Sequence, residues 1–341
     1  MTANCNSKRS DPRLFDPPAA MRILFFVTLF ASASTLAAPG SNRIDLFPRL
    51  TSGQIIHYEI TYRSEKQTKT RSSVVLAEAP ADSVADVRAL LRVEILEATS
   101  HGSRGIIRAR TLLTALDGDA AKATQPSAQG PDAARVAPVG VPVVEFSIFP
   151  DGHIDQVTGL DALSADHQQA WLQWAARFAG AAVFPPGGIK PGQKWKSQQA
   201  EKVASPIAGL TWIRESTYVH NAPCRPLRFS DRGDFVESNE PPDGCAVVLT
   251  TASLKQESKP KDATPEDFRV RQLRTSGSAR GNNKTILYIS LGTGLVVRAS
   301  DEADQAMSVT IAKVDGSNHV SYDVQAKSTA EILLVTGDPP H

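Results

Sequence analysis

Excess charge of one sign is lacking in this sequence of 341 residues, which carries 37 lysines and arginines against 36 aspartates and glutamates. The formal net charge is +1. A near-neutral chain without a basic block has no electrostatic footprint for nucleic acid or for an anionic membrane surface. We therefore expect no nucleic-acid partner.

Long hydrophobic runs are also lacking. The run that begins at Ile23 and ends at Phe30 is far shorter than the roughly 20 apolar residues that a membrane-spanning helix needs. It lies in "MRILFFVTLFASASTLA" (21–37), where a single positive charge precedes it and small residues follow. This is the plan of a secretory signal peptide, with cleavage after Ala37. We expect a periplasmic or secreted mature chain without a permanent membrane span.

The polar, proline-rich residues 1–20 precede this signal. We expect them to be a non-native N-terminal extension, with Met21 as the alternative start of the protein. The mature chain would then begin at residue 38. Its charge stays close to neutral, because the removed part carries both signs.

Cysteine is scarce, with three residues in the chain. Cys5 lies in the segment that we expect to be removed, which leaves Cys224 and Cys245. Two thiols in an oxidising compartment most simply form a disulfide. A redox pair or half of a metal site is the alternative, although no C-x-x-C occurs and His220 is the one histidine nearby.

Motifs of known chemistry are absent as well. The sequences "HGSRG" and "SGSARG" lack the G-x-S-x-G elbow of hydrolases, and the histidines are scattered without metal-ligand spacing. "LGTGLV" lacks the third glycine of a dinucleotide-binding loop. We expect no catalytic residue, no metal and no cofactor. A hydrolase with a dispersed carboxylate pair leaves no sequence signature and stays an alternative, with Asp151, Asp155 and Asp161 as candidates.

What the sequence does contain is strand-type alternation of apolar and polar residues. It is clearest at 54–63, 105–114 and 210–217, and it recurs at 268–275, 295–299 and 305–314. Segment 84–97 fits either a helix face or a strand. We predict a strand there, because it would pair with 105–114.

One stretch has the helical period. "LSADHQQAWLQWAARFAG" starts at Ser164, a candidate N-cap, and ends at Gly180, a candidate C-cap. Its apolar stripe predicts a helix lying against a sheet. Aromatic residues on such a stripe fill a core or line a ligand cavity. The candidate lining residues of an apolar pocket are Trp171, Trp174, Phe178, Trp195 and Trp212.

Two stretches far apart in the chain are alike. "FPRLTSGQIIHYEITY" (47–62) and "FPPGGIKPGQKWKSQQ" (184–199) share Phe-Pro, then Gly-Gln, then an aliphatic or aromatic residue two places after the glutamine. We predict a mainly β (α+β) fold of two similar antiparallel units, half-barrel or sandwich-like, joined by one amphipathic helix. The units are 38–160, with a disordered insertion at 116–140, and 189–335. The connecting helix and Pro/Gly turn occupy 161–188, and a tail occupies 336–341.

A proline-rich turn followed by a strand with Gly192 and Trp195 resembles uncharacterised secreted bacterial β-rich proteins that carry a "kvGdsW"-like strand after a helix. The resemblance covers roughly residues 47–335, with Gln193-Lys194 in place of the acidic or serine pair, and it implies no activity. We predict an exported, non-enzymatic binding protein for an apolar ligand or lipid. The alternative is a structural or assembly factor that contacts other envelope proteins.

Overall fold

The computed structural model describes most of one compact unit, Asn42–His341. The described residues are 43–73, 82–98, 105–116, 142–149, 154–178, 184–185, 187–200, 205–230, 234–257, 259–316 and 318–337, with the side chains of 198–200 left aside. The predicted signal peptide, nearly all of the predicted insertion at 116–140 and the end of the tail lie outside these residues.

The described chain is mainly β, which confirms the predicted fold class. The strands are β1 (Ile55–Ser72), β2 (Ser83–Ala98), β3 (Ile107–Ala115), β4 (Val143–Ile148), β5 (Ile154–Thr158), β6 (Lys194–Ala200), β7 (Leu210–Cys224), β8 (Leu227–Phe229), β9 (Phe235–Glu237), β10 (Asp243–Gln256), β11 (Leu273–Ser290), β12 (Val296–Lys313) and β13 (His319–Thr336). The helices are the 3-10 helix η2 (Leu160–Ala162) and the α-helices α2 (Ala165–Phe178) and α3 (Glu266–Val270).

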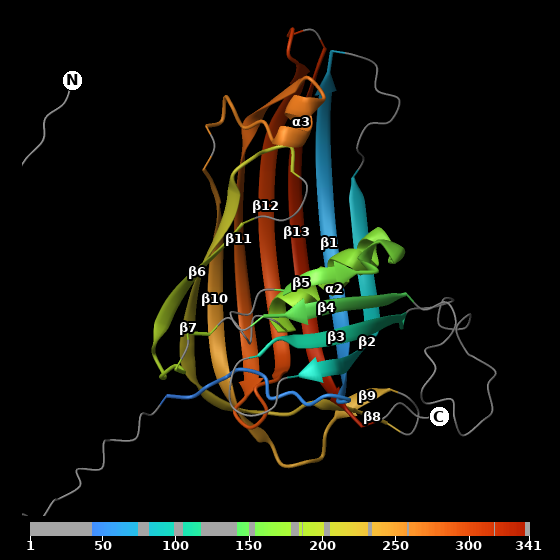
Figure 1. Ribbon diagram of the computed structural model, residues 1–341, viewed down its shortest axis with the longest axis vertical. Helices are drawn as coiled ribbons and strands as arrows, with labels where there is room; N and C mark the ends of the chain where they lie inside the picture. The colour runs from blue at the N-terminus through green and yellow to red at the C-terminus, as the bar shows by residue number, and fades with distance from the viewer. Residues whose placement is uncertain are drawn as a thin grey trace, which may run out of the picture. The chain divides into compact units, whose positions relative to one another are not determined.

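All strands belong to one sheet with the order β5-β4-β3-β2-β1-β13-β12-β11-β10-β7-β6, and the β8–β9 hairpin is attached to β13 (Figure 1). The pairs along this path are antiparallel. The predicted unit 38–160 supplies β1 to β5, and the predicted unit 189–335 supplies β6 to β13. The two units are therefore adjacent blocks of a single sheet, joined where β1 pairs with β13, and not two separate sheets.

The turns that lead into β1 and β6 have the same geometry. Gly53 and Gly192 have positive φ angles of 81° and 79°, and each lies two residues before its strand. The next residue is a glutamine in both turns, and its Oε1 accepts the backbone N–H three residues earlier, from Thr51 or Lys190, at 3.1 Å. The repeated Gly-Gln therefore builds the same local structure twice. The equivalence of the whole halves stays a prediction.

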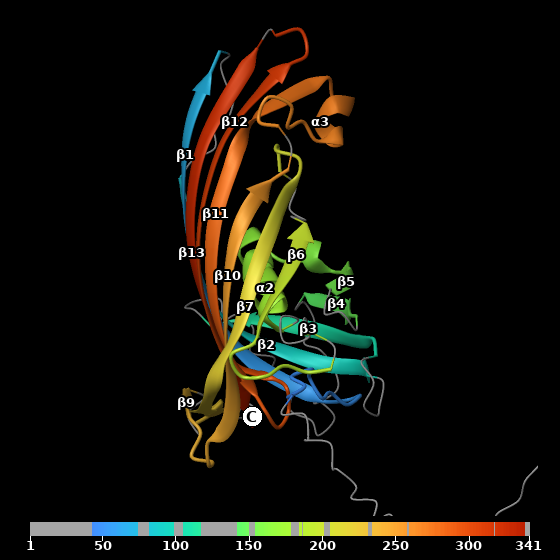
Figure 2. The same ribbon diagram turned by 90° about the vertical axis from the view of Figure 1, so that its left-hand side faces the viewer.

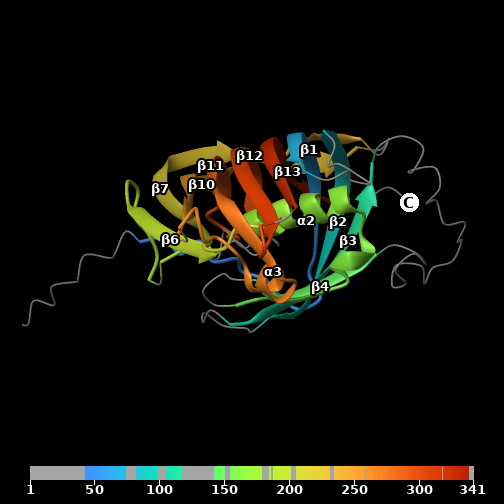
Figure 3. The same ribbon diagram turned by 90° about the horizontal axis from the view of Figure 1, so that it is seen from above.

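The sheet is strongly curved, and both α-helices lie on its concave side (Figure 2). Seen from above, α2 lies between the long strands on one side and β3 and β4 on the other (Figure 3). Trp174 packs in this space between Tyr58 of β1 and Phe146 of β4, with ring centroids 6.1 and 5.8 Å away. The Nε1–H of Trp171 donates to Thr111 of β3 at 2.8 Å. The helix therefore fixes how far the sheet closes over it.

The long strands continue beyond their apolar stretches. Segments 295–299 and 305–314, predicted as two strands, are parts of one strand, β12, which runs through the polar "SDEAD" between them. Pairing with β11 and β13 satisfies the backbone there without apolar side chains. Segment 84–97 is a strand as predicted, because β2 pairs with both β1 and β3.

The prediction of a strand at 268–275 is wrong in its first half. Residues Glu266–Val270 form α3, and β11 begins only at Leu273. Glu266 and Asp267 in the first turn favour the helix N-terminus. Gln272 has a φ of 57°, which separates the helix from the strand.

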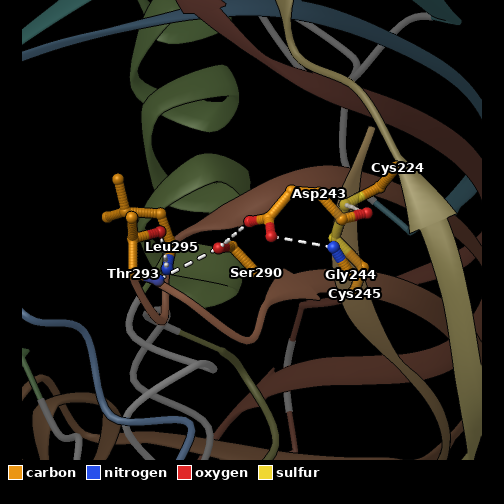
Figure 4. The surroundings of a disulfide bond; sticks show 7 residues. All are labelled: Cys224, Asp243, Gly244, Cys245, Ser290, Thr293 and Leu295. Atoms are coloured by element: carbon orange, nitrogen blue, oxygen red, sulfur yellow. Dashed lines mark hydrogen bonds between the residues drawn. A yellow bond between two sulfur atoms is a disulfide. The ribbon is translucent and has the colours of Figure 1, made fainter. Parts of the chain in front are cut away.

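Cys224 at the end of β7 and Cys245 near the start of β10 form a disulfide with Cα atoms 5.8 Å apart (Figure 4). Beside it, the hydroxyl of Ser290 donates to Asp243 and accepts the backbone N–H of Thr293. These bonds tie the turn between β11 and β12 to the start of β10. The disulfide also encloses the β8–β9 hairpin, which pairs with β13.

Candidate functional site

Helix α2 contacts the packed core with one face and borders a cavity with the opposite face. Trp171, Trp174 and Phe178 are at most 3% exposed and point into the main core. The opposite face carries Gln169, Leu172, Gln173 and Ala176, at the i, i+3, i+4, i+7 spacing, and it borders a cavity of about 540 Å³. We call this the large cavity.

The large cavity lies between α2 and the inward face of the long strands. Leu210, Trp212, Leu254, Met307 and Val324 supply its larger apolar side chains. Leu210 also belongs to a second apolar cluster with Ile207, Ala263 and Val309, against which Leu254 and Met307 pack. The cavity therefore separates two packed cores.

Small residues at inward strand positions leave this space open. Three alanines line the cavity: Ala279 of β11, Ala303 of β12 and Ala326 of β13. Elsewhere along β11 and β13, the buried positions carry large core residues such as Ile289 and Ile332. Gly281 also lies on this face, because a Cβ there would come within 2.9 Å of Trp212 Cη2. An alternation of small and polar residues is the sequence signal for the cavity.

One cavity-lining residue, Arg177, belongs to a buried ion pair. Arg177, in the last turn of α2, pairs with Asp301 of β12, and their side chains are 10% and 3% exposed. Asp301 also accepts hydrogen bonds from Asn283 Nδ2 at 2.8 Å and from Thr285 Oγ1 at 2.5 Å. Three donors surround the Asp301 carboxyl group, and the pairing holds Arg177 in place.

A smaller cavity of about 90 Å³ adjoins this pair, and we call it the polar chamber. Hydroxyl groups come to it from Ser197 of β6, Ser216 of β7, Thr250 of β10 and Thr285 of β11. Its remaining lining residues are Ala176, Arg177, Phe184, Trp195, Arg214, Val248 and Leu287. Three of them, Ala176, Arg177 and Arg214, also line the large cavity.

The five aromatic residues singled out as candidate pocket lining therefore lie in three places. Trp171, Trp174 and Phe178 are in the packed core. Trp212 lines the large cavity, and Trp195 lines the polar chamber, where its ring packs on Phe184 with centroids 5.3 Å apart. Sequence reasoning missed Arg177, Arg214 and Asp301, because charged residues on a strand or helix do not reveal which face they occupy.

Two of the three carboxylates proposed for a dispersed hydrolase site are among the described residues. Asp155 and Asp161 are exposed, and Asp155 accepts the backbone N–H of Gln156 at 2.7 Å in a turn-type contact. Asp151 lies outside the described residues. Within those residues, no group of three or more His, Cys, Asp or Glu side chains could hold a metal ion.

No helix in the described part of the chain is long and apolar enough to cross a membrane. The chain matches no family model and no curated protein. Among solved structures, it aligns with the outer membrane protein OprG from Pseudomonas aeruginosa at 8% identity and a TM-score of 0.17, over 86% of this chain and 100% of that one.

Two further alignments are of the same kind. A mutant porin of Rh. blastica aligns at 7% identity and a TM-score of 0.18, over 82% of this chain and 100% of that one. The CymD monoaromatic hydrocarbon channel aligns at 9% identity and a TM-score of 0.14, over 86% and 90% of the two chains. TM-scores this low do not establish a shared fold, and no function is transferred from these proteins.

Proposed function

We propose that this chain is an exported binding protein of the cell envelope that holds an apolar or amphiphilic small molecule, such as a lipid, in the large cavity. The observation that carries the proposal is a cavity of about 540 Å³ between two packed cores, whose lining combines large apolar side chains with polar and positively charged ones. Its volume falls in the range of about 300–1,000 Å³ that is typical of small-molecule sites.

Export is supported by the sequence and by the disulfide. The signal-type segment 21–37 would direct the chain out of the cytoplasm. A disulfide between Cys224 and Cys245 persists in an oxidising compartment. An envelope protein of this kind would meet lipids and other apolar molecules that water dissolves poorly.

Filling the cavity tests the proposal. Ala326→Trp places an indole on the cavity side of β13, whereas Thr329→Trp places the same group on the exposed outer face of that strand. We expect the wild-type protein and Thr329→Trp to bind the neutral fluorescent probe N-phenyl-naphthylamine, and Ala326→Trp to lose it. Equal binding by all three proteins would contradict the proposed site.

Native mass spectrometry of the protein purified from its own envelope provides the second test. A co-purified lipid or other apolar molecule supports the proposal. A specific partner protein found by crosslinking in cells, with no bound small molecule, favours the alternative role as an assembly factor. That partner could pair with β6, which ends the path of the sheet.

A further inference from the structure

We propose that the ligand is an anionic amphiphile, with a carboxylate or phosphate headgroup on an apolar chain. Arg177 and Arg214 would hold the headgroup at the polar chamber while the chain lies in the large cavity. This inference rests on the proposed function and specifies its ligand class.

The charge of the lining is one-sided. Arg177 of α2, Arg214 of β7, Lys66 of β1 and Arg280 of β11 are among the residues that line the large cavity. No aspartate or glutamate is among the described lining residues of either cavity. A cavity lined by one sign of charge with apolar walls attracts a ligand of the opposite sign.

One donor of the Arg177 guanidinium group, Nε, has no hydrogen-bond acceptor among the described residues. Its Nη2 pairs with Asp301 and donates to Gln173 Oε1 at 3.0 Å, while its Nε is buried without a hydrogen-bond partner among the described residues. The residue is 9% exposed. A buried N–H without an acceptor is costly, and an anionic oxygen would satisfy it. The ion pair with Asp301 fixes the guanidinium in place before any ligand arrives.

Arg214, on β7, is the second arginine that lines both cavities. It is opposite Ser197 of β6 and Ala252 of β10. Ala252 is small, which leaves room beside the longer arginine. Two arginines from different elements therefore line both the polar chamber and the large cavity.

The two cavities match the two ends of an amphiphile. The polar chamber, at about 90 Å³, has room for only a few non-hydrogen atoms, and Ser197, Thr250 and Thr285 are among its lining residues. The Thr250 hydroxyl is hydrogen-bonded to that of Ser216 at 2.8 Å, and the Thr285 hydroxyl donates to Asp301. Hydroxyl and guanidinium groups are suited to carboxylate and phosphate oxygens. The large cavity, with Leu172 and Met307 in its lining, is suited to an apolar chain.

Isothermal titration of the full mature chain tests the inference with four probes: dodecanoate, dodecyl phosphate, dodecanol and inorganic phosphate. We expect the two anionic amphiphiles to bind at least roughly tenfold more tightly than dodecanol, because hydrogen bonds to charged groups contribute more than neutral ones. The better of the two identifies the headgroup. Inorganic phosphate should bind weakly, and binding as tight as that of dodecyl phosphate would overturn the need for a chain.

The variant Arg214→Gln should weaken the anionic amphiphiles about tenfold or more and leave dodecanol unchanged. Arg298→Gln is the matched control, because this arginine pairs with Glu331 on the outer face and lines neither cavity. If Arg214→Gln does not fold, Ser197→Asp on β6 tests the same point by placing a negative charge in the polar chamber. It should repel the anionic probes only.

The outcomes separate the two proposals. Equal affinity for anionic and neutral amphiphiles, or anionic affinity unchanged in Arg214→Gln and in Ser197→Asp, overturns the anionic headgroup and leaves the binding function standing. No binding of any amphiphile, with loss of the naphthylamine probe signal in the wild-type protein, overturns both.

Discussion

The indole of Trp212 lies against the backbone of Gly281, so closely that a Cβ at this glycine would be 2.9 Å from Cη2 of the ring. Trp212 is 8% exposed and lines the large cavity from β7, whereas Gly281 belongs to β11. The missing side chain lets the ring cross β10 and rest on the next strand. This contact sets the width of the cavity at its apolar wall.

A side chain at position 281 should therefore reduce ligand binding. In Gly281→Val the new methyl groups displace the Trp212 ring toward the cavity, and we expect the affinity for an apolar probe to fall several-fold. Gly244→Ala in β10 is the control, because its Cβ would meet only Leu291 Cδ1 at an ordinary 3.4 Å. Probe titration measures both variants, and an unchanged affinity in Gly281→Val would refute the role of this contact.

The buried pair of Arg177 and Asp301 should dominate the stability of the helix–sheet contact. Asp301→Asn leaves the Arg177 charge without its counter-ion away from water, and we expect a loss of about 3–5 kcal/mol in the free energy of unfolding. Glu331→Gln removes one partner of an exposed pair with Arg298 and should cost no more than about 1 kcal/mol. Urea unfolding compares them, and similar losses would show that Asp301 is not needed to balance Arg177.

The fold class, the one long helix and the strands at 84–97 and 105–114 could be predicted from the sequence because their periodicity is local. The position of the large cavity could not be predicted from the sequence. Its walls are the polar and small middle parts of β11, β12 and β13, whose strand structure depends on pairing with neighbours far along the chain. The aromatic stripe of α2 drew attention to Trp171 and Trp174, but the face of the helix that borders the large cavity is the opposite one.

Tyr58 should limit stability at alkaline pH. Burial raises the pKa of this tyrosine well above its ordinary value of 10.0, so the folded state favours the neutral phenol. Its contribution to stability is present in full below pH 10 and is lost as the pH rises above that value. We expect Tyr58→Phe to remove part of the alkaline loss of stability, measured by urea unfolding at a series of pH values.

The same variant should be close to neutral or stabilising at pH 7. The Tyr58 hydroxyl is buried without a hydrogen-bond partner among the described residues, so its removal leaves no partner unsatisfied. Tyr218→Phe is the contrast, because that hydroxyl donates to Asn221. A large destabilisation in Tyr58→Phe would mean that the hydroxyl has a partner.

The disulfide should contribute stability without taking part in binding. Cys224 and Cys245 are 21 positions apart, and a loop of this size corresponds to about 3 kcal/mol in the chain-entropy model. We expect the double variant Cys224→Ser, Cys245→Ser to lose about this much in urea unfolding and to keep its affinity for the apolar probe. Amide exchange should rise first in β8 and β9, which the loop contains.

Quenching of tryptophan fluorescence by a bromine-labelled fatty acid tests the central claim most directly, because quenching requires contact between the bromine and the indole. Trp212 lines the large cavity, whereas Trp171 lies in the packed core. We predict saturable quenching in the wild-type protein and in Trp171→Phe, and loss of most of it in Trp212→Phe. Absence of quenching in the wild-type protein, or full quenching in Trp212→Phe, would contradict the account.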